Sequence, residues 1–202
     1  MREESWKQYC VWKREDLPNE KPCCIVITKN RIFMGKYFEN NFSGGSVTPM
    51  QIRLAKTEDA GRIKGLYKVL YRETSRLQPE FIRETEQDEQ YLKFIILGEN
   101  GDIILAEQEG QLLGFVMVQQ KKTRYIGCLV PYRYAYLPDI VVAEEYRRQG
   151  IGKKLLRAAK VWAKNRGLEY VELNCLSGNM AAKALYESED FAECMCTMRT
   201  KL

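Results

Sequence analysis

The sequence contains no histidine, which removes the commonest general base and the commonest metal ligand from any site that the chain builds. Catalysis would have to use carboxylates, tyrosine, cysteine or water. The seven cysteines are an odd number and include no Cys-x-x-Cys pair, so neither a disulfide framework nor a zinc-ribbon site is indicated. We therefore expect reduced thiols and no metal centre.

The sequence also lacks long apolar runs. None approaches the ~18 residues that a membrane span needs, and the acidic start Met1-Arg2-Glu3-Glu4 has no signal-peptide core. These absences predict a cytoplasmic protein with no membrane partner. The formal charge of +5 is modest for 202 residues, and basic and acidic residues are interleaved, so no nucleic-acid partner is expected.

What is present is a globular composition, with 45% apolar and 29% charged residues. The length allows one domain of ~150 residues and a short appendage. Two apolar stretches on either side of residues 29–31 predict a β-hairpin, and residues 40–46 have the composition of a linker. We expect an N-terminal β-rich extension over residues 1–49 and a catalytic domain over residues 50–202.

From residue 50 the apolar spacing alternates between strand and helix periods, which predicts an α/β (α+β) fold. The expected strands cover residues 51–55, 103–108, 111–120, 134–142, 170–175 and 192–199. The expected helices are one capped by Thr57, one that buries Leu92, Ile95 and Ile96, one from the turn at 147–152 to about Arg166, and one over about 179–187.

Three local signals refine this order. Glu109-Gly110 predicts a tight hairpin turn, because the glycine supplies a left-handed conformation. Pro138 interrupts the strand at 134–142 and predicts a bulge or bend, since proline lacks a ladder donor. Four cysteines fall in the apolar strand regions and are predicted to be small core side chains: Cys128, Cys175, Cys194 and Cys196.

The turn that joins the strand at 134–142 to the next helix is rich in glycine and positive charge. The first N–H groups of that helix lack intrahelical partners and form an anion site. Gly150 and Gly152 would let a phosphate approach the backbone, and four cations surround them: Arg147, Arg148, Lys153 and Lys154. We predict a pyrophosphate site, and an ordinary strand-to-helix connection is the alternative.

Two other phosphate motifs fit this turn poorly. A Walker A loop needs Ser or Thr where Lys154 stands. A dinucleotide-binding fingerprint needs a small residue where Leu155 stands, and it would normally open the fold. The turn therefore does not predict a P-loop or a Rossmann fold.

The turn resembles the acyl-CoA signature of the GNAT superfamily of N-acetyltransferases, which is Gln or Arg, two residues, Gly, one residue, then Gly or Ala. The matching residues are Arg147, Gly150 and Gly152. A second box of that family, Asn-x-x-Ala-x-x-Leu-Tyr, is matched downstream by Asn179, Ala182, Leu185 and Tyr186. The resemblance covers roughly residues 50–202. One departure is Asp190, which replaces the usual glycine and which we expect in the left-handed conformation.

The resemblance implies a GNAT fold, in which a mixed central sheet is flanked by helices and strands four and five splay apart. Acetyl-CoA would place its pantetheine between these strands, and a backbone N–H there could stabilise the oxyanion of the reaction. The implied cofactor-binding residues are Ile140, Val141, Val142, Arg147, Arg148, Gln149, Gly150, Ile151, Gly152, Lys153 and Asn179.

The resemblance also implies two catalytic roles. Tyr186 matches the tyrosine that protonates the departing thiolate, and a phenol of pKa ~10 is protonated at neutral pH. Asp139 is the first candidate for the base that deprotonates the amine, with Tyr136 and Glu172 as weaker candidates. The alternatives are that Tyr186 only packs and that Asp139 only faces solvent. The acid-rich residues 80–89 would either attract a cationic amine or form a solvated face.

The expected function is direct acetyl transfer from acetyl-CoA to a primary amine of a small cationic metabolite, an antibiotic-like polyamine or a protein. A GNAT-fold module that binds acyl-CoA without turnover is the alternative. A homodimer is the default expectation for the assembly.

Overall fold

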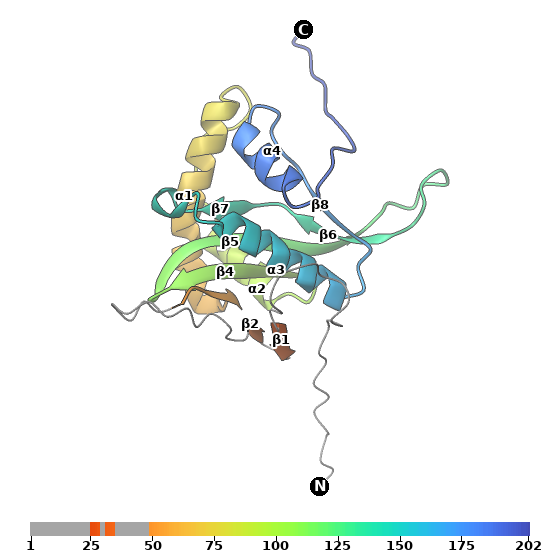
Figure 1. Ribbon diagram of the computed structural model, residues 1–202. Coiled ribbons are helices and arrows are strands. Elements are labelled where there is room, and N and C mark those ends of the chain that lie inside the picture. Colours follow the sequence, from red (N-terminus) through yellow and green to blue (C-terminus); the bar gives the residue numbers. More distant parts are fainter. Residues whose placement is uncertain (1–24, 29–30, 35–48) are drawn as a thin grey trace, which may run out of the picture.

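The computed structural model describes residues 25–28, 31–34 and 49–202 (Figure 1). In the N-terminal part, β1 (Ile25–Thr28) and β2 (Arg31–Met34) form an antiparallel pair, which confirms the predicted hairpin. The expected linker at residues 40–46 lies outside the described residues, and the domain boundary near residue 49 stays a prediction.

The rest of the chain is built around a six-stranded mixed sheet. Its order is β3 (Gln51–Leu54), β4 (Gly101–Gln108), β5 (Gln111–Lys122), β6 (Arg133–Leu137) and β8 (Tyr170–Leu173), with β7 (Ile140–Val142) paired to β5 beyond the end of β6. The pair β6–β8 is parallel and the other pairs are antiparallel. The expected α/β fold with a mixed central sheet is therefore confirmed.

Helices lie on both faces of this sheet (Figure 1). They are α1 (Ala60–Leu77), α2 (Glu89–Leu97), α3 (Ile151–Asn165) and α4 (Met180–Glu187). Strand alternation divides the core between the two faces: Ile104 and Val116 pack with α3, whereas Ile103 and Phe115 pack with α1 and α2. No helix in the described part of the chain is both long and apolar enough to span a membrane.

The start of α1 differs from the prediction. Thr57 does not cap the helix, because a short 3-10 helix, Thr57–Asp59, precedes it. The backbone N–H of Lys56 instead donates to Asp59 Oδ2 over 2.8 Å. The capping carboxylate is thus two residues later than the predicted hydroxyl.

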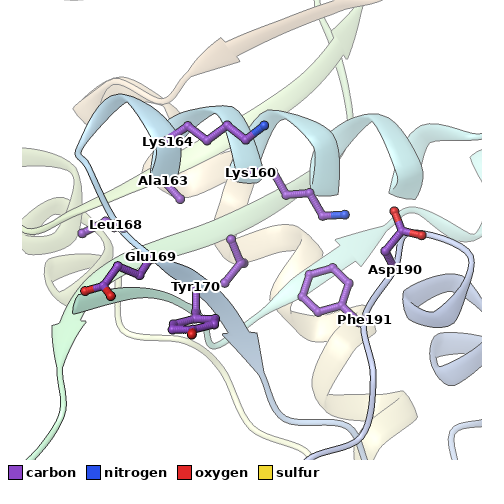
Figure 2. Close-up of a pocket in the computed structure, with 9 residues that line it drawn as sticks. Lys160, Ala163, Lys164, Leu168, Glu169, Tyr170, Asp190 and Phe191 are labelled. Carbon is purple, nitrogen blue, oxygen red and sulfur yellow. The ribbon is translucent and has the colours of Figure 1, made fainter. Parts of the chain in front are cut away.

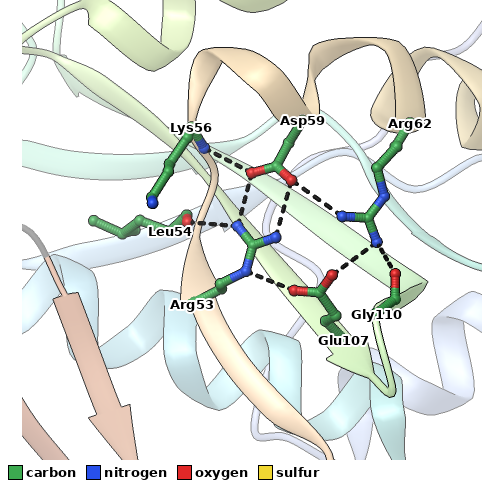
Figure 3. Close-up of polar contacts among 7 residues, drawn as sticks. All are labelled: Arg53, Leu54, Lys56, Asp59, Arg62, Glu107 and Gly110. Atoms are coloured by element: carbon green, nitrogen blue, oxygen red, sulfur yellow. Dashed lines mark hydrogen bonds and ion pairs between the residues drawn. The ribbon is translucent and has the colours of Figure 1, made fainter.

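Asp59 belongs to an ion network that ties the start of α1 to the sheet (Figure 3). Arg53 contacts Asp59 with both terminal nitrogens, at 2.7 and 2.9 Å, and donates from Nε to Glu107 at 2.7 Å. Arg62 contacts the same two carboxylates and donates to the carbonyl of Gly110. Two arginines and two carboxylates therefore join α1 to β3, β4 and the turn after β4.

The end of the chain also differs from the prediction. Residues 192–199 form no strand, and β8 is the edge of the described sheet. Met195 and Met198 are 85% and 90% exposed, so these apolar side chains do not pack into the core. The contacts of this segment are instead an ion pair of Lys183 with Glu193 and the guanidinium of Arg199 over the ring of Phe81.

The cysteine prediction fails for a related reason. Cys194 and Cys196 are exposed because they lie on this unpaired segment. Cys128 lies in the connection between β5 and β6, and Cys175 follows the end of β8, and both are exposed as well. None of these four thiols is a core side chain.

The unpaired edge borders an open groove of about 320 Å³ (Figure 2). Its walls are the second half of α3 and the beginning of β8, with Phe191 at one end. The glycine turn precedes the opposite end of α3, so this groove is separate from the predicted phosphate site.

Candidate active site

The sheet opens where β6 gives way to β7. Tyr136 is opposite Gln119, and Ile140 is opposite Val116. Three residues, 137–139, therefore face only two residues of β5, 117 and 118, so one extra residue is inserted. This is the β-bulge that Pro138 predicted. Beyond it, β8 pairs only with β6, and β7 has no strand on its outer edge within residues 49–202.

The open edge of β7 carries unpaired backbone groups. The N–H of Met117 bonds the carbonyl of Asp139, and the N–H of Ala143 bonds the carbonyl of Leu113. Since alternate residues of a strand direct their polar groups to opposite edges, Ile140 and Val142 direct theirs away from β5. Of the three predicted residues, Val141 instead lies in register opposite Phe115 and has a buried side chain. An extended ligand could therefore pair with Ile140 and with the N–H of Val142, whose carbonyl already accepts a hydrogen bond of 3.1 Å from Nε of Arg147.

The glycine turn follows β7 and leads into α3. Arg148 and Gly150 both adopt left-handed conformations, with φ of 64° and 77°. Gly150 is the N-cap of α3 and provides no side-chain cap, so the first N–H groups of the helix are left for an external acceptor. Arg148, Gln149, Lys153 and Lys154 are exposed around this point. The geometry is that of an anion site at a helix N-terminus.

The close packing of α4 explains why position 152 is a glycine, and the sequence did not indicate this packing. A Cβ atom at this position would lie 2.9 Å from Cδ2 of Leu185. The missing side chain therefore allows α4 to approach α3 closely. At Gly150, by contrast, an added Cβ would meet no atom within 4 Å, and the requirement is the positive φ.

Arg147 is engaged within the protein. Its Nη1 donates to Glu73 of α1 over 2.6 Å, and its Nε donates to the carbonyl of Val142 over 3.1 Å. Arg72 of α1 forms a second ion pair with Glu144, just before the turn. The guanidinium of Arg147 thus fixes the turn against α1 and β7.

Asp139 lies at the bulge and is half-buried, not solvent-facing. Its Oδ2 accepts a hydrogen bond of 2.8 Å from Oη of Tyr67, a fully buried residue of α1. Burial raises the pKa of the Asp139 carboxyl, and the bond from Tyr67 partly opposes this rise. A carboxylate with a raised pKa is a better proton acceptor than an ordinary aspartate, and this one lies at the open edge.

Tyr186 projects from α4, whose N-cap is Asn179. The Asn179 Oδ1 accepts from the N–H of Ala182 over 3.1 Å, so this side chain orients the helix. Burial, and to a lesser degree Cys175 and Asp139, raise the pKa of Tyr186 to about 12. Its phenol is consequently protonated at neutral pH, as a general acid requires.

The weaker base candidates are engaged elsewhere. The Tyr136 hydroxyl accepts from Nδ2 of Asn174, and Glu172 accepts from Oη of Tyr132 over 2.8 Å. In the acid-rich connection, Glu86 forms ion pairs with Lys64 and Lys68 of α1. Part of the negative charge predicted to attract an amine is therefore compensated within the chain.

Sequence reasoning missed Tyr67. Its position in the apolar stripe of α1 predicted a core residue, and its ring does pack on Phe115 and Tyr71 at centroid distances of 4.9 and 5.4 Å. Nothing in the spacing indicates that its hydroxyl reaches Asp139, 72 residues further along the chain.

Comparisons with known proteins agree with this architecture. The model of the acetyltransferase (GNAT) family matches residues 65–191. An uncharacterized N-acetyltransferase of Bacillus subtilis (strain 168), YhfO, is 31% identical over 147 residues, which are 71% of this chain and 91% of that protein. The thialysine N-epsilon-acetyltransferase of Mus musculus is also 31% identical over 147 residues, covering 68% of this chain and 81% of that protein.

Solved structures show the same fold. A mutant of the BH1408 protein from Bacillus halodurans has a TM-score of 0.72 at 20% identity, over 75% of this chain and 99% of that one. The aminoglycoside N-acetyltransferase AAC(6')-Iy, in complex with CoA, has a TM-score of 0.58 at 18% identity, over 77% of this chain and 95% of that one. The chain belongs to the GNAT family and is an N-acetyltransferase of that type.

Proposed function

We propose that the protein transfers an acetyl group from acetyl-CoA directly to a primary amine. One observation carries the proposal: the open edge of β7 is followed, after the connection 143–150, by a helix N-terminus without a side-chain cap, and Asp139 lies at the start of the edge. An extended pantetheine with a pyrophosphate at its end matches an edge followed by an anion site. A neighbour of the same fold, AAC(6')-Iy, was crystallised with CoA.

In this proposal the cosubstrate is held mainly by backbone groups. Ile140 and Val142 pair with pantetheine, and the N–H groups around Gly150 to Lys153 receive the pyrophosphate. Arg148, Gln149 and Lys153 add polar and positive groups around it. Arg147 acts by shaping the turn, since its guanidinium is bonded to Glu73 and Val142. Asn179 acts by capping α4.

The proposed chemistry has one nucleophilic attack and three proton movements. Asp139 accepts a proton from the ammonium, and the free amine attacks the thioester carbon to give a tetrahedral oxyanion. An N–H of β7 stabilises the oxyanion. The carbon–sulfur bond then breaks, and Tyr186 gives its proton to the departing thiolate. The nitrogen, which still carries one proton too many after the attack, releases it to the Tyr186 phenolate through water, so that the phenol is restored. The products are an N-acetylated amine and CoA.

The nature of the amine is the finer part of the proposal. Relatives and structural neighbours are named for thialysine, for aminoglycosides and for ribosomal-protein alanine. A half-buried carboxylate at the open edge, for which no cation partner is found among the described residues, suits a small cationic amine. We favour such a metabolite over a protein as the acceptor. We also propose that the enzyme is cytoplasmic and forms homodimers.

The test of the cosubstrate needs no acceptor. Acetyl-CoA is titrated by calorimetry into the wild-type chain, Gly150→Glu and Gly110→Glu. Gly110 is a matched control, because it also has a positive φ of 76° and no atom within 4 Å of an added Cβ. We expect binding to the wild type and to Gly110→Glu, and at least tenfold weaker binding to Gly150→Glu. Equal affinity of all three would refute the proposed phosphate site.

The test of the acceptor is a panel of amines with acetyl-CoA. Thialysine, lysine, the aminoglycoside sisomicin and a peptide with N-terminal alanine represent the acceptors named for the relatives and neighbours. Release of CoA together with a mass increase of the amine would identify the class. Tight acetyl-CoA binding without transfer to any amine would favour the non-catalytic alternative.

A further inference from the structure

Asp139 is hydrogen-bonded to a buried side chain of α1. The hydroxyl of Tyr67 donates to Asp139 Oδ2 over 2.8 Å. Tyr67 is 0% exposed in the middle of α1. The bond thus connects α1 to the bulge between β6 and β7.

The ring of Tyr67 is held firmly. It packs on Phe115 of β5 and on Tyr71, one helical turn away, and both ring pairs are tilted. Because the ring is enclosed, its hydroxyl has one direction available, and that direction meets Asp139. A buried phenol held in this way can fix the rotamer of a carboxylate.

The groups that face Asp139 are all neutral at physiological pH. They are Tyr67 and Tyr71 from α1, Tyr136 from β6 and Tyr186 from α4. Among the residues that the structure describes, Tyr67 alone is hydrogen-bonded to the carboxylate. No lysine or arginine of the described residues forms an ion pair with Asp139. The bond from Tyr67 is therefore the specific interaction that supports the charged form.

We infer that Tyr67 is a positioning residue for Asp139, which it holds at the open edge of β7 in the orientation that accepts the proton of the amine. The inference rests on the proposed function for the role of Asp139 as base. The hydrogen bond itself does not depend on that role, so the two can be tested separately.

The direction of the effect follows from the physical causes. Burial raises the pKa of Asp139, and the donated hydrogen bond lowers it. Replacing Tyr67 by phenylalanine removes the donor and leaves the burial, so the pKa of Asp139 must rise further. The base would then be protonated up to a higher pH.

The first measurement is a carbon-13 NMR titration of the aspartate carboxyl groups, with Asp139→Asn used to assign the signal. It compares the wild type with Tyr67→Phe and with Tyr71→Phe, which removes a nearby hydroxyl that is not bonded to the carboxylate. We expect the Asp139 midpoint to move to higher pH in Tyr67→Phe and to stay in Tyr71→Phe. An unmoved midpoint in folded Tyr67→Phe would overturn the inference.

The second measurement is the pH dependence of kcat/KM with sisomicin as the first probe, or thialysine if sisomicin is not acetylated. In Tyr67→Phe we expect the acid limb to move to higher pH, with a roughly tenfold loss on the acid side that shrinks as the pH rises. A merely structural role would lower kcat/KM evenly at every pH. Such an even loss would also overturn the inference.

A double-mutant cycle tests the inference even if Tyr67→Phe disturbs the fold. If Tyr67 acts through Asp139, adding Tyr67→Phe to Asp139→Asn changes kcat/KM little further, whereas independent effects would multiply. Multiplied losses would contradict the inference.

Failure of the wild type to acetylate any amine would refute the proposed function alone, because the NMR titration still decides whether Tyr67 controls Asp139.

Discussion

The guanidinium of Arg147 lies between Glu73 of α1 and the carbonyl of Val142, at 2.6 and 3.1 Å. Arg147 is the first residue of the glycine turn, and its side chain connects this turn to α1 and to the last residue of β7. The side chains of Arg147 and Glu73 are about one-third exposed, at 37% and 36%, so the ion pair is partly screened by solvent. We therefore expect its effect to be mainly geometric, because it holds the first residue of the turn against α1 and β7.

Glu73→Gln should therefore weaken acetyl-CoA binding without abolishing it. We expect a loss of about twofold to fivefold, since an exposed ion pair contributes ~0.5–1 kcal/mol. Glu86→Gln is the matched control, because Glu86 also pairs with α1, through Lys64 and Lys68, but has no bond to the turn. Calorimetry at two salt concentrations makes the comparison. Equal losses in both variants would show that the pair does not act through the turn.

Replacing Tyr186 by phenylalanine should separate turnover from binding. The phenol is the proposed acid, so we expect kcat to fall by about 100-fold, while the Kd of acetyl-CoA stays within about twofold. Tyr132→Phe is the control, because the pKa of Tyr132 is also raised to about 12, yet by a bond to Glu172 away from the open edge. Steady-state kinetics with calorimetry provide the two numbers. Unchanged kcat would remove Tyr186 from the mechanism.

Much of the fold could be predicted because its signals are local. Pro138 marked the bulge, Glu109-Gly110 marked the hairpin, and both residues of that turn have positive φ. Asp190 has φ of 63°, as expected for a residue in place of glycine. Each of these features follows from the conformational limits of a single residue.

The predictions that were wrong concern features that depend on residues distant in the sequence. Alternation at 192–199 predicted a strand, but a strand needs a ladder partner, and β8 does not pair with this segment. Thr57 was a suitable cap, but Asp59 is held by Arg53 from β3. Pairing across the fold therefore decided both features. The role of Arg147 in cofactor binding stays a prediction, and its guanidinium forms an ion pair with Glu73.

The ion network at the start of α1 should make a measurable contribution to stability. Asp59 has a side-chain exposure of only 9% and contacts two arginines. Asp59→Asn removes the charge and leaves Arg53 and Arg62 with one carboxylate, so we expect a loss of about 2 kcal/mol in the free energy of unfolding. Glu89→Gln, which breaks only an exposed pair with Lys93, should change it by less than about 0.5 kcal/mol. Urea denaturation measures both.

The same network predicts a pH dependence. The hydrogen bond from Arg53 lowers the pKa of Asp59 below its ordinary value. A carboxyl whose pKa is lower in the folded state stabilises the protein above its unfolded pKa of ~4, and this stabilisation is lost as the pH falls through the folded value. The difference in stability between wild type and Asp59→Asn should thus shrink as the pH falls below about 4. A constant difference down to pH ~2 would contradict the role of this carboxylate.

Gly152 matches a glycine of the acyl-CoA signature, and two explanations for a glycine at this position can be separated by experiment. If the glycine is needed because phosphate approaches it, Gly152→Ala should weaken acetyl-CoA binding. If it is needed because Leu185 lies 2.9 Å from an added Cβ, the alanine should displace α4 and with it Tyr186. The second explanation predicts a kcat about tenfold lower with a nearly unchanged Kd, since small displacements of a catalytic group are costly.

Shortening the opposing side chain completes the test. In Gly152→Ala/Leu185→Val, the smaller side chain makes room for the new methyl group, so kcat should recover most of its loss. Leu185→Val alone is the control and should cost about 1 kcal/mol of stability with little effect on kcat. Weak acetyl-CoA binding that persists in the double variant would instead assign Gly152 to the phosphate site, where α3 begins, and not to the packing of α4.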